Sequence, residues 1–268
     1  MEATSSRGFQ DTLAHVQYDT VQHADEKVCV SLAVPRSWQE LGRRQMEFVF
    51  KLLARELSAT EIKIMLLLRW NNIEVLQKDS EGGGVSCYVL KHNRQVFMLT
   101  TERLTELTLY LNWMDELPSA PVRLERLSRH KALPADFAGV AFETLLIIDN
   151  FYQGYLRTND DTLLDEIGQV LYDWDGHKFL TWQRVAIFYW VASLKNYLAR
   201  KFPTLFKPAD STSLAPTSVE DAMNIQIRAL TKGDITKEHD VLAMDCYRAL
   251  AELEAQAKEY EELKRKYK

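Results

Sequence analysis

The chain has 268 residues, enough for one large domain or two ordinary ones, and its 46% hydrophobic and 26% charged residues are typical of a globular protein. Its formal net charge of -5 lacks the excess of Lys and Arg with which nucleic-acid-binding proteins neutralise phosphates. Broad electrostatic binding to nucleic acid or acidic membranes is therefore disfavoured, although a local basic patch is compatible with this charge.

The cysteines and the N-terminus indicate a cytoplasmic protein. Cys29, Cys87 and Cys246 lie far apart and form no CxxC pair, so we expect reduced thiols rather than disulfides or a zinc module. The first residues lack the basic and apolar runs of a secretory signal. The apolar stretch 185–194 is about half as long as a membrane span, which favours a buried helix and no membrane partner.

The N-terminal part predicts a flexible arm followed by an α+β subdomain. Residues 1–26 are polar without sustained periodicity, which is typical of a flexible N-terminal arm. The α+β subdomain is assigned to residues 27–117, and its first strand, 28–34, ends at Pro35. Two S-x-x-E capping boxes, at 37–40 and 58–61, predict the starts of two helices.

The second half of this subdomain predicts a small antiparallel sheet. Apolar stretches at 73–76, 85–90 and 96–99 are separated by turn-forming residues and read as three strands. Thr100 is placed to cap the helix that follows them. The prolines after residue 117 mark the boundary.

The middle of the chain, residues 118–202, predicts a helical subdomain. Helices are expected at 142–156, 161–172 and 181–201, and the last is apolar on nearly all sides, which indicates a central position. The predicted fold class is therefore mainly α with a small antiparallel β-sheet (α+β), with a helical body and a C-terminal helical hairpin.

The C-terminal residues predict a helical hairpin on a linker. Residues 203–217 contain three prolines and several small polar residues, which is linker composition. Residues 218–268 form the hairpin, whose apolar seam is expected to bind a protein partner, a second copy, or the chain's own body. The predicted partner-binding residues on this seam are Met223, Ile227, Leu230, Leu250, Leu253 and Tyr260.

No motif assigns a catalytic residue, a cofactor or a metal. The glycine cluster at 81–86 lacks the phosphate-binding context, and the DWDG motif at 173–176 lacks the later ligands of a calcium loop, so both read as turns. The carboxylates at 160–166 are explained by helix capping, and the six histidines show no metal-ligand spacing.

The aromatic side chains between 151 and 197 have helical spacing, which favours a core over base stacking. Tyr152, Tyr155 and Trp182 are the members that a contact surface would use, since aromatic residues are enriched at interfaces.

Three segments resemble uncharacterised prophage and mobile-element proteins of gut bacteria. They are FYQGYL at 151–156, SLKNYLARKFPTLFKP at 193–208 and QIRALTKGDITKE at 226–238. The resemblance covers much of the chain but not the N-terminal arm or the sheet region. It implies a virion-assembly or tail-region accessory role and incorporation into a phage-like particle, and it carries over no catalytic residue.

The function predicted from these observations is a non-enzymatic protein–protein interaction factor, with an assembly or scaffolding role in a phage-like element. One alternative is a nucleic-acid-binding regulatory protein that uses the helices at 37–70 and the basic residues Arg43, Arg44, Lys51 and Arg55. The other is an enzyme whose site is assembled only by the fold.

Overall fold

The computed structural model describes residues 13–19, 27–80, 86–207 and 219–267, and the chain divides into two compact units. Unit 1 is Met1–Glu116 and unit 2 is Leu117–Lys268, so the division lies next to the boundary predicted at residue 117. Helices predominate among the described residues and the strands pair antiparallel, which is the predicted α+β class. Within these ranges, none of the helices combines the length and the hydropathy needed to cross a bilayer.

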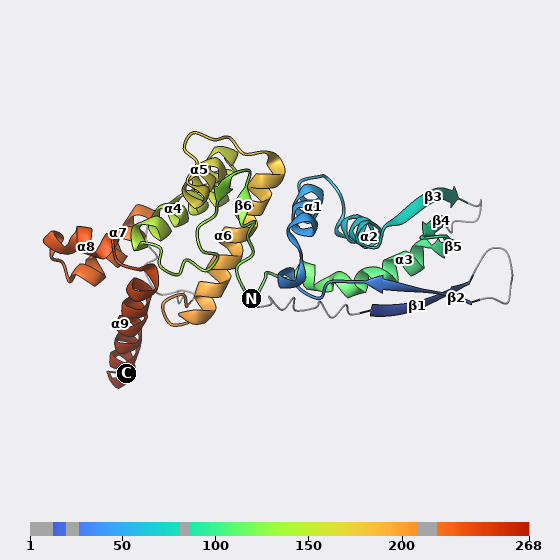
Figure 1. The fold of residues 1–268 in the computed structure, drawn as a ribbon. Coiled ribbons are helices and arrows are strands. Elements are labelled where there is room, and N and C mark those ends of the chain that lie inside the picture. The colour runs from blue at the N-terminus through green and yellow to red at the C-terminus, as the bar shows by residue number, and fades with distance from the viewer. Residues whose placement is uncertain (1–12, 20–26, 81–85, 208–218, 268) are drawn as a thin grey trace, which may run out of the picture. The chain divides into compact units, whose positions relative to one another are not determined.

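The described residues of unit 1 form three helices and two antiparallel sheets (Figure 1). Its elements are β1 (Leu13–Asp19), β2 (Lys27–Ala33), α1 (Arg43–Leu53), α2 (Ala59–Trp70), β3 (Ile73–Ser80), β4 (Ser86–His92), β5 (Gln95–Thr100) and α3 (Thr101–Thr108), with 3-10 segments at Trp38–Glu40 and Leu109–Asp115. The predicted three-stranded sheet is confirmed as the meander β3-β4-β5. Thr100 caps α3 as predicted, because its Oγ1 accepts the N–H of Arg103 at 3.3 Å.

The prediction of a flexible arm over residues 1–26 is wrong for residues 13–19. These form β1, which pairs antiparallel with β2 so that Val16 lies opposite Val30. The sequence carries the signal, because Ala14, Val16 and Tyr18 alternate with polar residues at the period of a strand. The rest of the predicted arm lies outside the described residues.

The helix predicted to begin at Ser37 begins later. Ser37 precedes only the 3-10 turn, and Glu40 accepts the N–H of Arg36 at 2.7 Å rather than that of Ser37. Helix α1 starts after Gly42, whose N–H is accepted by the side chain of Gln45 at 2.9 Å. The second capping box is confirmed, because Ser58 and Glu61 each accept the other's N–H at the start of α2.

The core of unit 1 lies between its helices and the meander. Its fully or nearly fully buried members include Val49, Phe50, Leu52, Leu66, Leu90, Phe97, Leu104 and Leu111. Lys63 is buried beside them, and its ammonium donates hydrogen bonds to Asp115 and Asn112 at 2.5 and 3.0 Å, which compensate for the burial of its charge. The side chain of Asn71 accepts the N–H of Ala33 at 2.7 Å, so α2 is tied to the end of β2.

Unit 2 is built around one long central helix (Figure 1). Its elements are the short strands β6 (Arg126–Leu127) and β7 (His130–Lys131), and the helices α4 (Phe142–Thr158), α5 (Asp161–Tyr172), α6 (Thr181–Lys201), α7 (Val219–Thr231), α8 (Glu238–Leu242) and α9 (Cys246–Lys266). The bounds predicted for α5 and α6 are the observed ones, and α4 runs two residues beyond its predicted end.

Trp190 of α6 occupies the centre of the unit 2 core and is fully buried. Its ring meets those of Phe137 and Tyr172 edge to face, and its indole N–H donates to the carbonyl of Ala135 at 2.9 Å. The hydroxyl of Tyr172 donates to the carbonyl of Leu124 at 3.0 Å. The prediction that the stretch 185–194 forms a buried central helix is therefore confirmed.

The second arm of the predicted C-terminal hairpin is not one helix. A 3-10 turn at Ile235–Lys237 and the short helix α8 precede α9, which starts afresh at Asp245. The carboxylate of Asp245 accepts the N–H groups of Tyr247 and Arg248 at 3.0 and 3.1 Å, which is N-cap geometry. The chain turns before this cap, and only α9 continues the predicted seam.

Candidate functional site

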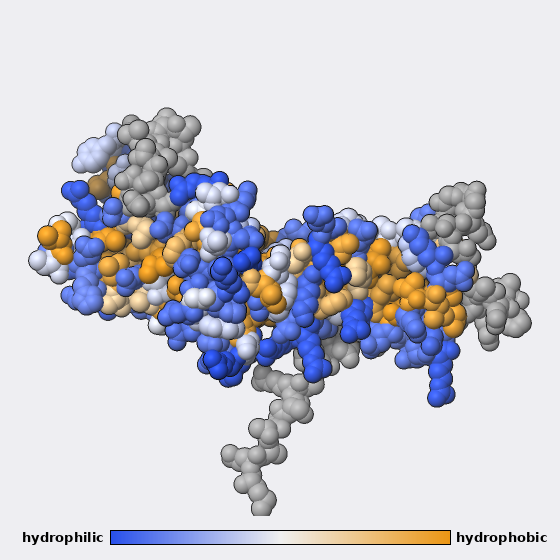
Figure 2. All heavy atoms as spheres, turned by 90° about the horizontal axis from the view of Figure 1, so that it is seen from above, coloured by the Kyte–Doolittle hydropathy of each residue, from blue (hydrophilic) through white to orange (hydrophobic). Residues whose placement is uncertain are grey.

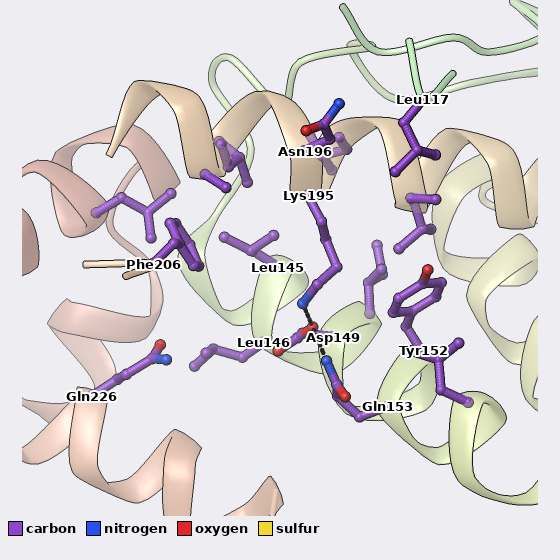
Figure 3. A pocket seen from close by; sticks show the side chains of 18 residues that line it. Leu117, Leu145, Leu146, Asp149, Tyr152, Gln153, Lys195, Asn196, Phe206 and Gln226 are labelled. Atoms are coloured by element: carbon purple, nitrogen blue, oxygen red, sulfur yellow. Dashed lines mark hydrogen bonds and ion pairs between the residues drawn. The ribbon is translucent and has the colours of Figure 1, made fainter. Parts of the chain in front are cut away.

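A groove of about 470 Å³ lies in unit 2 between α4 and α6 (Figure 3). Leu145, Asp149, Tyr152 and Leu156 line it from α4 at spacings of four, three and four, which places them on one face of that helix. The facing wall comes from α6, the central helix, which has apolar residues on most of its sides. The groove has the size of a ligand or peptide site and a largely apolar lining.

An ion pair occupies the middle of the groove (Figure 3). The ammonium of Lys195 donates to Asp149, and it also lies 5.7 Å from the centre of the Tyr152 ring. Gln153 donates to the same carboxylate at 3.5 Å. Burial, and then the charge of Asp149, raise the pKa of Tyr152, so its phenol stays neutral at physiological pH. These polar groups can orient a bound segment through hydrogen bonds.

Large apolar side chains are exposed around the rim of the groove. Leu117 is 55% exposed, Leu156 is 50% exposed and Phe206 is 39% exposed. Figure 3 shows Phe206 at the end of the groove where Gln226 of α7 lies, and Leu117 toward the opposite end. Exposed apolar residues that gather around an apolar groove are characteristic of a contact site rather than of ordinary surface.

The start of α9 is fixed to the body of unit 2 through main-chain hydrogen bonds. The N–H of Cys246 donates to the carbonyl of Val140, and that of Phe142 donates to the carbonyl of Met244, both at 2.8 Å. The carboxylate of Asp245 accepts the N–H of Gly139 at 2.9 Å. The C-terminal segment therefore docks on its own body, one of the options that the sequence left open.

Docking changes the interpretation of two predicted partner-binding residues. Leu250 and Leu253 are only 2% and 5% exposed, and Leu250 contributes to the lining of the groove, so neither offers a free surface to a partner. The other predicted residues differ in exposure: Met223, Ile227 and Leu230 on α7 are half-buried, and Tyr260 on α9 is 66% exposed.

The apolar seam of α9 continues beyond the part that docks. The first half of the seam is buried and consists of Cys246, Ala249, Leu250 and Leu253. Tyr260, Leu263 and Tyr267 continue it at spacings of three and four, and their exposures are 66%, 53% and 88%. The end of α9 projects from the other helices of unit 2 (Figure 1). We call these three residues the α9 stripe.

The segment predicted as a linker is partly structured. Residues 203–207 pack against α9, because the carboxylate of Glu254 accepts the N–H groups of Leu205 and Thr204 at 2.7 and 3.3 Å. Phe206 of this segment reaches the groove. The rest of the predicted linker, from residue 208 on, lies outside the described residues.

The other motifs of the sequence form turns and core in the described ranges. The DWDG segment is the turn between α5 and α6, with Asp173 and Gly176 at φ of 48° and 66°. His130 and His177 stack on opposite sides of Trp174, at 4.1 and 3.5 Å between ring centres. No group of three His, Cys, Asp or Glu side chains suited to a metal occurs among the described residues, and the glycine cluster lies largely outside them.

Sequence reasoning missed most of the groove. Among the lining residues, the sequence predicts a contact role only for Leu250, on the seam of the hairpin, and for Tyr152, as an aromatic residue of a contact surface. The spacing of apolar residues along α4 was visible, but its partner across the groove depends on how α4 and α6 pack. The described residues form an α+β protein with a largely apolar groove in unit 2, and the chain matches no family model, no curated protein and no solved structure.

Proposed function

We propose that this protein is a non-enzymatic assembly factor that associates with further copies of itself. The α9 stripe of one copy occupies the groove between α4 and α6 of the next copy. One observation carries this proposal: unit 2 exposes an apolar helix face, at Tyr260, Leu263 and Tyr267, and also an apolar groove with an exposed rim. Amphipathic helices bind such grooves through apolar side chains three and four residues apart.

The α9 stripe cannot fill the groove of its own unit. Leu250, near the start of α9, already lies against that groove, and the helix rises about 1.5 Å per residue. Tyr260 and Tyr267 are therefore about 15 and 25 Å further along the axis. The stripe can meet a groove only on another copy, which makes the contact head-to-tail and able to repeat.

The contact is expected to be weak when it forms singly. Burial of a Leu or Tyr side chain contributes about 1.5–3 kcal/mol, and association itself costs several kcal/mol. Three anchoring side chains therefore suit a dissociation constant in the micromolar range or weaker. Assembly at high local concentration fits the scaffolding role that the resemblance to prophage proteins implies.

The test is sedimentation velocity of the full chain from about 5 to 200 μM, a range chosen for micromolar association. Leu263→Asp changes the stripe and Leu156→Asp changes the groove rim, and both side chains are half-exposed, so the fold tolerates the charge. The control Leu109→Asp makes the same change at an exposed position of unit 1. We expect the wild-type and control chains to form larger species with concentration, and each unit 2 variant to stay monomeric.

Mixing the two unit 2 variants makes the test specific. The intact stripe of the Leu156→Asp chain can enter the intact groove of the Leu263→Asp chain, so the mixture should form 1:1 dimers and nothing larger. A wild-type chain that is monomeric throughout, a Leu263→Asp chain that assembles normally, or a mixture that stays monomeric would each contradict the proposal.

The narrower role in a phage-like element rests on the sequence resemblance. Its test is the identity of the neighbouring genes. Tail or capsid genes on either side would support it, and metabolic neighbours would count against it.

A further inference from the structure

A second hollow, of about 500 Å³, lies in unit 1 between α1 and the end of α2. Its lining differs from that of the groove because it combines cations with aromatic rings and amides. The lining residues used below are Arg44, Gln45, Phe48, Lys51, Arg69 and Trp70. In the space-filling view, hydrophilic residues gather over α1 (Figure 2).

The cations of the hollow come from two helices. Arg44 and Lys51 of α1 are seven residues apart and therefore lie on one face of that helix, with Phe48 between them. Arg69 of α2 lies over the Phe48 ring, 6.0 Å from its centre. Neither Arg44 nor Arg69 has an acidic partner within the part of the chain that the structure describes. Glu47 also borders the hollow, but Arg43 neutralises it at 2.9 Å.

We propose that this hollow binds single-stranded nucleic acid through its phosphates and bases. Arg44 and Lys51 are about 10 Å apart along the helix axis, which is wider than one phosphate. The site therefore fits neighbouring phosphates of a strand better than one free nucleotide. Arginine side chains and aromatic rings beside them supply the stacking surfaces that single-strand binders use. This inference goes beyond the assembly role and does not depend on it.

The overall charge of -5 limits the contact to this local patch. About three cations take part, so the logarithm of affinity should fall with the logarithm of salt concentration with a slope near -2. A protein with a broad basic face would show a steeper dependence.

The experiment measures fluorescence anisotropy of a labelled 12-nucleotide single strand with the full chain at several salt concentrations. Arg44→Gln and Arg69→Gln each remove one cation from the hollow. Arg94→Gln is the matched control, because it makes the same change at an exposed residue of unit 1 that does not line the hollow. Each hollow variant should bind about five- to tenfold more weakly at low salt and lower the slope by about 0.7, while the control binds like the wild type.

Two further probes separate the strand from other sources of phosphate. A duplex of the same sequence and a single nucleoside triphosphate should both bind much more weakly than the strand. Circular dichroism of every variant checks that the fold is retained.

The proposal is overturned by any of three results: no binding of the strand at low salt, equal weakening by Arg94→Gln and Arg44→Gln, or equal affinity for the nucleoside triphosphate and the strand. The last result would assign the hollow to a free nucleotide.

Discussion

At the scale of single residues, Asp165 shows how unit 2 keeps a charge inside. Burial by itself would raise its pKa, but hydrogen bonds from Arg184 and from the N–H of Phe179 outweigh it and hold the pKa below the ordinary value of 3.8. Its two oxygens accept from the Arg184 guanidinium at 2.8 and 2.7 Å, in a bidentate pair. Asp165 thereby joins α5 to the start of α6.

We expect Asp165→Asn to destabilise unit 2 by roughly 3 kcal/mol, because it leaves Arg184 without its buried partner. Urea unfolding at pH 7 measures the loss. The control Asp161→Asn removes a half-exposed carboxylate 3.3 Å from the same arginine and should cost less than about 1 kcal/mol. Equal effects of the two variants would contradict this account.

The same contact has a defined pH dependence. A carboxyl group whose pKa is lower in the folded state stabilises the fold above its unfolded pKa, and this stabilisation is lost as the pH falls through the folded pKa. The stability difference between the wild-type chain and Asp165→Asn should therefore be constant from about pH 5 to 7 and shrink below about pH 4. Unfolding curves at these pH values test the sign.

Position 168 of α5 requires a glycine because of close packing and not because of its backbone conformation. A Cβ at this position would lie 2.5 Å from Phe179 and 2.6 Å from Ile187. We expect Gly168→Ala to destabilise unit 2 by about 1–3 kcal/mol in thermal unfolding, although Ala is the better helix former. Gly154→Ala in α4 is the control, because its Cβ would meet only the flexible end of Leu163, at 3.0 Å, and its effect should be smaller.

At the scale of elements, Glu254 decides how the segment after α6 is held. Its carboxylate is 6% exposed and accepts the N–H groups of Thr204 and Leu205. Burial alone would raise its pKa, but these hydrogen bonds and that of Lys258 lower it below the ordinary value. The segment 203–207 is thereby fixed on α9, and Phe206 is placed at the groove.

We expect Glu254→Ala to release this segment without unfolding the helices, because α9 keeps its separate anchor at Asp245 and Cys246. Hydrogen exchange at Thr204 and Leu205 should accelerate strongly while that of α6 is unchanged. Glu252→Ala, two residues earlier in α9 at an exposed position, is the control. Unchanged exchange at Leu205 would show that other contacts hold the segment.

At the scale of the whole molecule, the proposed contact between copies links stability to concentration. Association that requires the folded state raises the unfolding midpoint as the protein concentration rises. Calorimetry at about 10 and 200 μM covers the micromolar range expected for the dissociation constant. The unfolding midpoint of unit 2 should rise between these concentrations for the wild type and should not change for Leu263→Asp. An equal rise in both chains would assign the association to a different surface.

The sequence by itself determined the elements whose signals are local. The bounds of α5 and α6, the cap at Ser58, the cap at Thr100 and the meander follow from periodicity and capping, which depend on neighbouring residues. Local signals predicted a helix start wrongly where two capping residues lie close together in the chain. At Ser37 a capping box was present, but Glu40 bonded to Arg36, and the helix started at the next cap.

Only the tertiary structure decided which apolar faces are covered. The sequence showed one continuous seam on α9, but it could not show that Leu250 and Leu253 are buried while Tyr260, Leu263 and Tyr267 remain exposed. The groove likewise needs α4 and α6 to pack side by side, and the basic hollow needs Arg69 of α2 to reach Phe48 of α1. The physical reason is that exposure and complementarity are properties of pairs of elements far apart in the chain, whereas periodicity is a property of one element alone.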